Sequence, residues 1–201
     1  MTLKLSQNDP KMMPKRPKTD PLVIHTQTAS EYWDRRGSLV HTDLQGKDLP
    51  EHDKVRVFLF ASSQHFADPL QSKQDALLAQ ITGSTRYPPN PLNTTPVLRA
   101  LLDKLDQWVR NGSPPPPSQV PSVADGTAVK AIDVKKRFPL IPGLNCSFAI
   151  NRVYFQDHGD QFSKGILNQE PPIEHLDKEY PIYVSQVDHD GNEISGIRTP
   201  H

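Results

Sequence analysis

A nearly continuous hydrophobic run occupies residues 55–61 and is interrupted only by Arg56. Such a run, without strict alternation, is typical of a strand that is buried on both faces, as in a parallel sheet covered by helices. Ser62 and Ser63 end the run, and His65 follows them. Open α/β sheets carry functional groups just beyond the carboxyl ends of their strands, so His65 is a candidate catalytic residue. The alternative is a histidine in a surface loop.

A second strand is predicted over Pro21–Gln27, where hydrophobic residues again follow one another. A short helix is expected directly after it and ends at Gly37. Thr28 or Ser30 can cap the amino end of this helix, and Glu31 in the first turn suits the helix dipole.

The clearest helical periodicity lies between residues 95 and 112. Thr95 is predicted as the N-cap, Pro96 as the first helical residue and Gly112 as the terminator. Hydrophobic residues recur three and four positions apart, which predicts one face packed on the core. These residues are Val97, Leu98, Leu101, Leu102, Leu105, Trp108 and Val109.

The rest of the chain is polar and rich in proline. We predict a disordered leader over residues 1–20, an α/β segment over 21–112, and a proline-rich spacer with a β-rich extension over 113–201. The run Pro114–Pro117 is a rigid spacer or, alternatively, a polyproline ligand for an SH3-type partner. Smaller predicted elements are helical turns at 75–81, strands at 127–132, within 146–155 and at 180–187, a proline-pinned segment at 135–142, a loop over most of 157–177, and a closing hairpin whose turn is 188–192.

Composition limits the core and the partners. Hydrophobic residues make up 35% of the 201 residues and there are 21 prolines, so much of the chain must be loop or extended connection. The formal net charge is zero, which predicts neither a nucleic-acid partner nor attraction to an anionic membrane. We find no apolar stretch that suits a signal peptide or a transmembrane helix, and we expect a cytoplasmic protein. The single cysteine, Cys146, excludes an intrachain disulfide and is expected to be a packing residue.

Glu31 and His65 are the candidate acid and base. Each lies just beyond a predicted strand, so the two side chains meet at one edge of the sheet if the strands are parallel neighbours. A carboxylate there can accept the Nδ1 proton of His65 and leave Nε2 as a base. The alternative for Glu31 is a helix-start carboxylate that interacts only with the helix dipole.

The sequence contains no motif for a nucleophile and none for a metal or cofactor site. The Gly-x-Ser-x-Gly elbow of hydrolases does not occur, and serines 62 and 63 lie too close in sequence to His65 to reach it at a useful angle. No histidine pair has the spacing of a helical zinc site. The segment Asp188–Asn192 has some residues of a calcium loop but lacks its distal glutamate, and a hairpin turn explains it better. We expect no metal and no cofactor.

Six segments, taken in order, resemble the C-terminal part of a large α/β-hydrolase domain family. The resemblance rests on a Ser-Glu-Tyr-Trp segment, a Ser-Leu-x-His-Thr segment, a strand ending in Gln-His, a Leu-Arg-Ala-Leu helix, a Pro-Pro-x-Ser-x-x-Pro spacer and a closing Val-Asp-x-Asp-Gly-Asn-x-x-x-Gly-Ile-Arg. The segments are 21–33, 38–43, 55–65, 97–112, 115–126 and 180–200.

The resemblance implies the last two parallel strands and the last helix of an α/β-hydrolase fold, followed by a β-rich extension. It further implies that Glu31 is the acid and His65 the histidine of a triad whose serine lies upstream. Two departures stand out. Family members carry several hundred residues before this point, including the nucleophile elbow and the oxyanion loop, and serine replaces the glycine that precedes Gln-His.

Three functions remain open at this stage. The chain resembles the C-terminal part of a serine ester hydrolase acting on small esters, truncated and without its nucleophile, in which case the isolated chain is inactive. It could instead be one piece of a split hydrolase that assembles with a separately encoded N-terminal half. The third reading is a non-enzymatic binding module that uses the β-rich part and the spacer.

Overall fold

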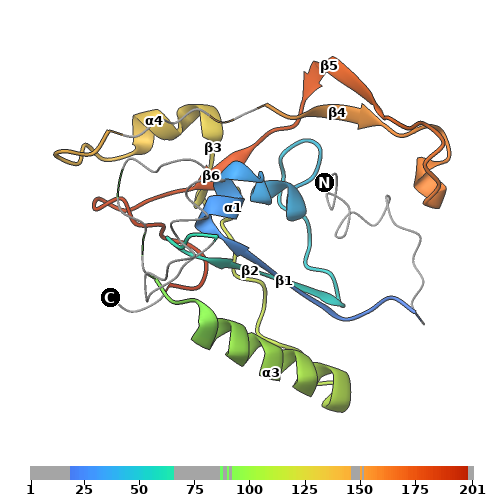
Figure 1. Ribbon diagram of the computed structural model, residues 1–201, viewed down its shortest axis with the longest axis horizontal. Coiled ribbons are helices and arrows are strands. Elements are labelled where there is room, and N and C mark those ends of the chain that lie inside the picture. The colour runs from blue at the N-terminus through green and yellow to red at the C-terminus, as the bar shows by residue number, and fades with distance from the viewer. Residues whose placement is uncertain are drawn as a thin grey trace, which may run out of the picture.

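The computed structural model describes residues 19–65, 87, 90, 92–145, 150 and 152–198. The predicted helical turns at 75–81, Cys146 and nearly all of the predicted leader lie outside the described residues. Figure 1 shows a two-stranded sheet near the middle of the described chain, with α3 below it and α1 above it, and a second strand pair at the top.

The centre of the fold is the pair β1, Val23–Thr28, and β2, Val55–Phe60. The strands are parallel, as the family resemblance implied, with Val23 opposite Val55 and Thr28 opposite Phe60. Five of the six β2 residues are buried, and Leu59 is fully inaccessible to solvent. The prediction of a strand covered on both faces is therefore confirmed.

The second edge of β2 is covered by two short segments from far along the chain. Gln119 pairs with it through its own N–H to the carbonyl of Val57 and its carbonyl to the N–H of Leu59, at 2.9 Å each. Ile197 donates to the Leu59 carbonyl and accepts from Ala61 further along the strand. The predicted spacer thus contributes to the sheet, because Ser118 and Gln119 are hydrogen-bonded to β2.

Helix α1, Ala29–Asp34, follows β1 directly and leads into a 3₁₀ turn, Gly37–Val40. Its N-cap is Thr28, one of the two predicted caps. Tyr32 is fully buried, and Trp33 packs against the hydrophobic cluster of the β-rich part. Helix α1 therefore connects the central strands with the β-rich extension.

Helix α3, Thr95–Asn111, begins at N-cap Thr94 and ends at Gly112, whose φ of 68° is left-handed. The predicted N-cap Thr95 is the first helical residue instead. Leu101 and Trp108 are buried and Val97 packs on the Phe58–Phe60 cluster, so the predicted packing on the core is confirmed for only part of the hydrophobic face. Leu98, Leu102 and Val109 are 43%, 65% and 65% exposed.

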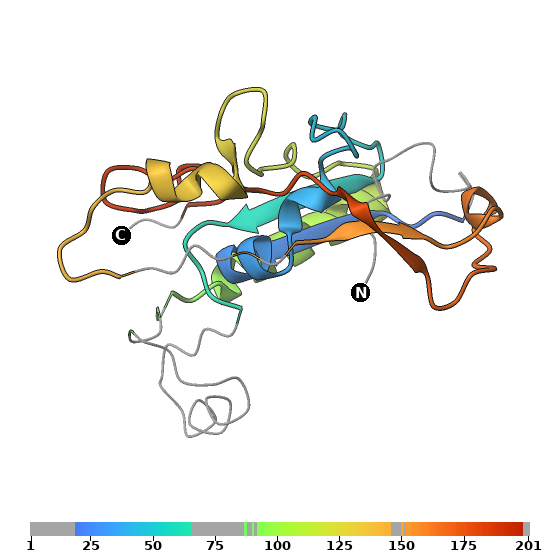
Figure 2. The same cartoon turned by 90° about the horizontal axis from the view of Figure 1, so that it is seen from above.

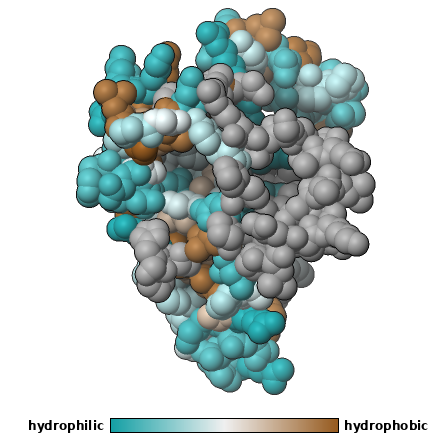
Figure 3. All heavy atoms as spheres, turned by 60° about the vertical axis from the view of Figure 1, so that its left-hand side comes forward, coloured by the Kyte–Doolittle hydropathy of each residue, from teal (hydrophilic) through white to brown (hydrophobic). Residues whose placement is uncertain are grey.

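The breadth of the surface beneath α3 explains this difference. The sheet is two strands wide within the described residues, and α3 packs through Val97 and Leu101 on a cluster formed by Ile24 of β1 and by Phe58 and Phe60 of β2. Only the central line of the hydrophobic stripe can therefore reach the sheet. In the space-filling view the lower end of the molecule, where α3 lies, shows hydrophobic residues beside hydrophilic ones (Figure 3).

The β-rich extension contains two antiparallel pairs. Strand β3, Ala128–Lys130, pairs with β6, Tyr183–Ser185, and strand β4, Tyr154–Asp157, pairs with β5, Ile173–Glu179. The β4–β5 ribbon projects from the rest of the molecule in both ribbon views (Figures 1 and 2). The remaining short helices are the 3₁₀ turns Ala131–Asp133 and Phe162–Lys164 and helix α4, Val134–Arg137.

Several predictions for this region need correction. The strand predicted at 127–132 is confirmed for residues 128–130, but helical turns replace its end and the start of the proline-pinned segment. Residues 173–177 belong to strand β5 and are not loop, because they pair with β4 more than fifteen positions earlier, a contact that local sequence does not reveal. The closing turn is confirmed, since Val187 bridges Glu193 across residues 188–192.

Candidate active site

Glu31 occupies the third position of helix α1 and is held there by a capping box. The Thr28 hydroxyl accepts a hydrogen bond from the Glu31 N–H at 3.3 Å, and both the N–H and the hydroxyl of Thr28 donate to Glu31 Oε2, at 2.8 and 2.9 Å. This reciprocal arrangement satisfies free donors at the helix start. It also occupies one carboxylate oxygen and leaves the other, Oε1, directed elsewhere.

His65 supplies the partner of that second oxygen. It follows the carboxyl end of β2, and its Nδ1 lies 2.9 Å from Glu31 Oε1. The side chains are 49% exposed for His65 and 31% for Glu31, so solvent or a substrate can reach the histidine. The structure thus brings the two sequence-predicted residues together, because β1 and β2 are parallel neighbours that end at the same edge.

The electrostatics favour a charged Glu31. Burial alone would raise its pKa, but the hydrogen bonds from Thr28 and the interactions with His65 outweigh burial and hold the pKa below its ordinary value. Glu31 is therefore a carboxylate at neutral pH and can accept only. In the neutral ring that pairs with this carboxylate, Nδ1 carries the proton and Nε2 is the acceptor nitrogen.

Replacing Thr28 by valine tests how the cap holds Glu31. The variant keeps the β-branched shape but removes the hydroxyl that both accepts from and donates to Glu31, and we expect a loss of about 1 kcal/mol in the free energy of unfolding. Urea unfolding at neutral pH measures it. Thr94→Val is the matched control, because this N-cap threonine of α3 makes no side-chain capping bond. Equal losses in both variants would contradict a specific role for the Thr28 hydroxyl.

The serines next to His65 are engaged in local structure. Ser63 is buried and its hydroxyl donates to the Phe60 carbonyl at 2.7 Å. The Ser62 hydroxyl accepts from the Glu193 N–H at 3.2 Å, and Ser62 itself has a φ of 55°, in the left-handed region. Both hydroxyl contacts are therefore made with groups other than His65, the expected base.

Glu193 is a residue at this site that sequence reasoning missed. Its side chain is 4% exposed, and its Oε2 accepts a hydrogen bond from the Ser62 N–H at 2.6 Å. Burial raises its pKa to about 7. Its only sequence signal was its position after the closing turn, where alternation would equally suit an exposed strand residue.

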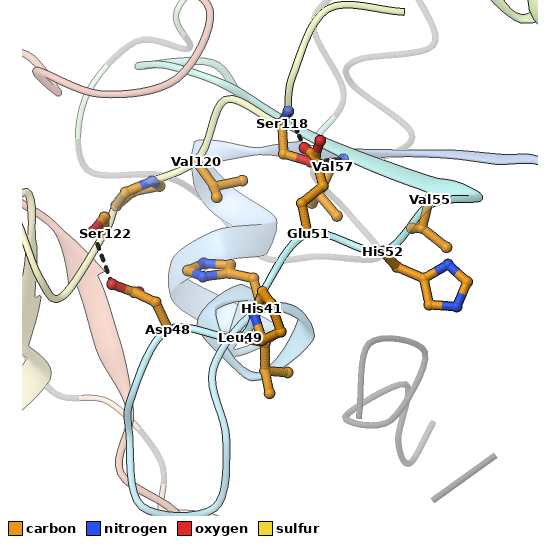
Figure 4. Close-up of a pocket in the computed structure, with 12 residues that line it drawn as sticks. His41, Asp48, Leu49, Glu51, His52, Val55, Val57, Ser118, Val120 and Ser122 are labelled. Atoms are coloured by element: carbon orange, nitrogen blue, oxygen red, sulfur yellow. Dashed lines mark hydrogen bonds between the residues drawn. The ribbon is translucent and has the colours of Figure 1, made fainter. Parts of the chain in front are cut away.

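A separate pocket of about 210 Å³ lies at the start of β2, where Val55 and Val57 line it (Figure 4). Its polar groups already have partners within the protein. Asp48 accepts from the Ser122 hydroxyl at 2.8 Å and from two backbone N–H groups, and Glu51 accepts from the Ser118 N–H at 2.5 Å. These contacts attach the spacer to the loop before β2, so we assign the pocket a structural role.

His41 borders this pocket and is also structural. It is 7% exposed, and its Nε2 lies 2.9 Å from the Tyr32 hydroxyl. Burial lowers its pKa to about 4, while the negative charge of Asp48 opposes the shift. His41 is therefore neutral at physiological pH.

The described residues contain no group of three or more histidines, cysteines, aspartates or glutamates that could hold a metal ion. Asp188 instead shapes the closing turn, accepting at Oδ1 from the N–H groups of Asp190 and Asn192. Among the helices of the described part, none is long and apolar enough to cross a membrane.

Comparison with known proteins adds one finding. A family model described as an alpha/beta hydrolase domain matches residues 2–201. The match includes residues 2–20 of the segment predicted as a leader. No curated protein and no solved structure matches the chain.

Proposed function

The chain belongs to the alpha/beta hydrolase domain family, and from this premise we propose that it forms the C-terminal part of a serine ester hydrolase. In this proposal Glu31 is the acid and His65 the histidine of the catalytic triad. The observation that carries it is the 2.9 Å contact between His65 Nδ1 and Glu31 Oε1 beyond the ends of two adjacent parallel strands. Hydrolases of this fold use an acid and a histidine in this chain order, after the serine.

The chemistry follows from the orientation of the pair. His65 Nε2 removes the proton of a serine hydroxyl as that oxygen attacks the carbonyl carbon of a small carboxylic ester. Glu31 remains ionised and stabilises the imidazolium that forms. His65 then gives the proton to the alcohol as it leaves, and water releases the acid in a second round with the same proton transfers.

The serine itself is proposed to come from outside this chain, from a separately encoded N-terminal half. The sequence contains no Gly-x-Ser-x-Gly elbow, and the hydroxyls of Ser62 and Ser63 are engaged with Glu193 and Phe60. The chain alone is then expected to lack esterase activity, because removing a triad member costs several orders of magnitude in rate.

Fluorophosphonate labelling, read by intact mass, tests this proposal. The 201-residue chain alone should form no adduct. After assembly with a polypeptide that carries the elbow, the serine of that polypeptide should be labelled, and labelling should be lost when His65→Ala replaces the native chain. A stoichiometric adduct on this chain that disappears in His65→Ala would show that it holds its own nucleophile. If the assembly were labelled to the same extent with His65→Ala as with the native chain, the proposed role of the histidine would be refuted.

One observation favours the alternative, a non-enzymatic binding module. The projecting β5 strand is exposed along most of its length, with Ile173 at 52% and Leu176 at 70%. Hydrophobic side chains on a two-stranded ribbon are suited to pairing with a partner. This alternative would be supported if the native protein and the His65→Ala variant bound such a partner with equal affinity. It also requires that the chain does not assemble with a second hydrolase half.

A further inference from the structure

Glu193 reaches the candidate site from the last part of the chain. It directly follows the closing turn. Four residues later, Ile197 is hydrogen-bonded to β2 through both of its backbone groups: its N–H donates to the Leu59 carbonyl at 2.7 Å and its carbonyl accepts from the Ala61 N–H at 3.1 Å. Gly196 allows this close approach, since a Cβ there would lie 2.6 Å from the Leu59 carbonyl oxygen. The segment therefore holds Glu193 firmly against the end of β2.

The carboxylate of Glu193 holds the start of the loop that carries His65. Its Oε2 accepts from the Ser62 N–H at 2.6 Å, while the Glu193 N–H donates to the Ser62 hydroxyl at 3.2 Å. Ser62 is one of two residues other than glycine with positive φ among the described residues, and this conformation is unfavourable for serine. The paired hydrogen bonds offset that cost and fix the direction in which the chain leaves β2.

The same carboxylate also interacts electrostatically with side chains of helix α1, which carries Glu31. The side chain of Trp33 interacts favourably with the charged form of Glu193. The hydroxyl of Tyr32 has its pKa raised, mainly by burial and further by the charges of Glu193 and Asp48. A backbone hydrogen bond of 3.2 Å from Ser30 to Ser63 joins the helix and the loop directly. Glu193 is thus hydrogen-bonded to the loop that carries His65 and interacts electrostatically with the helix that carries Glu31.

We propose that Glu193 is a positioning residue for the Glu31–His65 pair: by accepting a hydrogen bond from Ser62, it fixes the start of the His65 loop and so sets the distance between His65 Nδ1 and Glu31 Oε1. This inference rests on the proposed function for its catalytic meaning. The geometric part needs neither a serine nor turnover. The acceptor oxygen is the required feature, so glutamine should replace it and alanine should not.

Nitrogen-15 NMR of the histidine rings tests the inference at pH 8, where the signal that disappears in His65→Ala identifies His65. The native protein and Glu193→Gln should both show mainly the Nδ1-protonated ring. In Glu193→Ala that fraction should fall at least about twofold, because the pair is no longer held at hydrogen-bonding distance. If Glu193→Ala does not fold, Glu193→Asp, which withdraws the carboxylate by one methylene, should show the same fall.

Glu179→Ala is the matched control, since Glu179 is an exposed glutamate of the distant strand β5. An unchanged His65 spectrum in folded Glu193→Ala or Glu193→Asp would overturn the inference, as would an equal change in Glu179→Ala. Failure of the proposed function is recognised separately, by labelling that does not depend on His65. The two outcomes are therefore distinguishable.

Discussion

Replacing Glu193 by glutamine is expected to remove a contribution to stability of about 3 kcal/mol that Glu193 makes at pH 5 and no longer makes at pH 8. Burial raises the pKa of Glu193 from 4.5 to about 7, so the folded protein holds this proton more tightly than the unfolded chain. Stability from this group is complete below pH 4.5 and is lost as the pH rises through 7. Glutamine has no proton to lose and keeps an acceptor for Ser62.

Urea unfolding, followed by the fluorescence of the two tryptophans, measures this at pH 5, 6, 7 and 8. The difference between Glu193→Gln and the native protein should grow in favour of the variant as the pH rises. Glu179→Gln, which removes an exposed carboxylate paired with Arg152, is the control for the loss of a negative charge elsewhere on the protein. A profile for Glu193→Gln parallel to the native one would mean that Glu193 is not buried as a titrating acid.

A buried carboxylate that costs stability at neutral pH is typical of functional sites. Apolar packing at this position would avoid that cost but would leave the Ser62 N–H without an acceptor. The stability profile and the positioning of His65 therefore report on one contact. Glu193→Gln separates them, since it removes the charge while keeping the acceptor.

Local sequence was sufficient for the central strands, and the family resemblance was needed to make them parallel neighbours. The run 55–61 is too uniformly hydrophobic for a half-exposed strand, and the structure buries it on both faces. Once β1 and β2 are parallel neighbours, Glu31 and His65 must approach each other, because each lies shortly after the end of its strand. Their catalytic role stays a prediction.

Long-range contacts account for what the sequence did not reveal. Ser62 and Glu193 are 131 positions apart, and nothing in the residues around either one specifies the other. The pairing of Gln119 and Ile197 with β2 is of the same kind. For helix α3 the sequence revealed the hydrophobic stripe but not its burial. Periodicity identifies such a stripe, but it does not give the width of the surface that covers it.

Replacing His41 by glutamine is expected to stabilise the protein at acid pH, by about 3 kcal/mol near pH 4, relative to its effect at pH 7.5. Burial lowers the pKa of His41 from 6.5 to about 4, so the unfolded chain takes up a proton that the folded protein refuses. Stability from this group is complete above pH 6.5 and is lost as the pH falls through 4. Glutamine cannot be protonated in this range and keeps a polar group near the Tyr32 hydroxyl.

The two buried groups act in opposite directions between pH 4.5 and 6.5, so their contributions partly cancel in the native protein. Glu193→Gln should then show stability that rises with pH in this window, and His41→Gln stability that falls. The double variant should be flat, because each single variant removes one of the two slopes. His52→Gln, at a partly exposed histidine on the rim of the pocket, is the matched control. If the unfolding free energy of His41→Gln changed with pH between 4 and 6.5 as that of the native protein does, the inference that His41 is buried as a neutral group would be wrong.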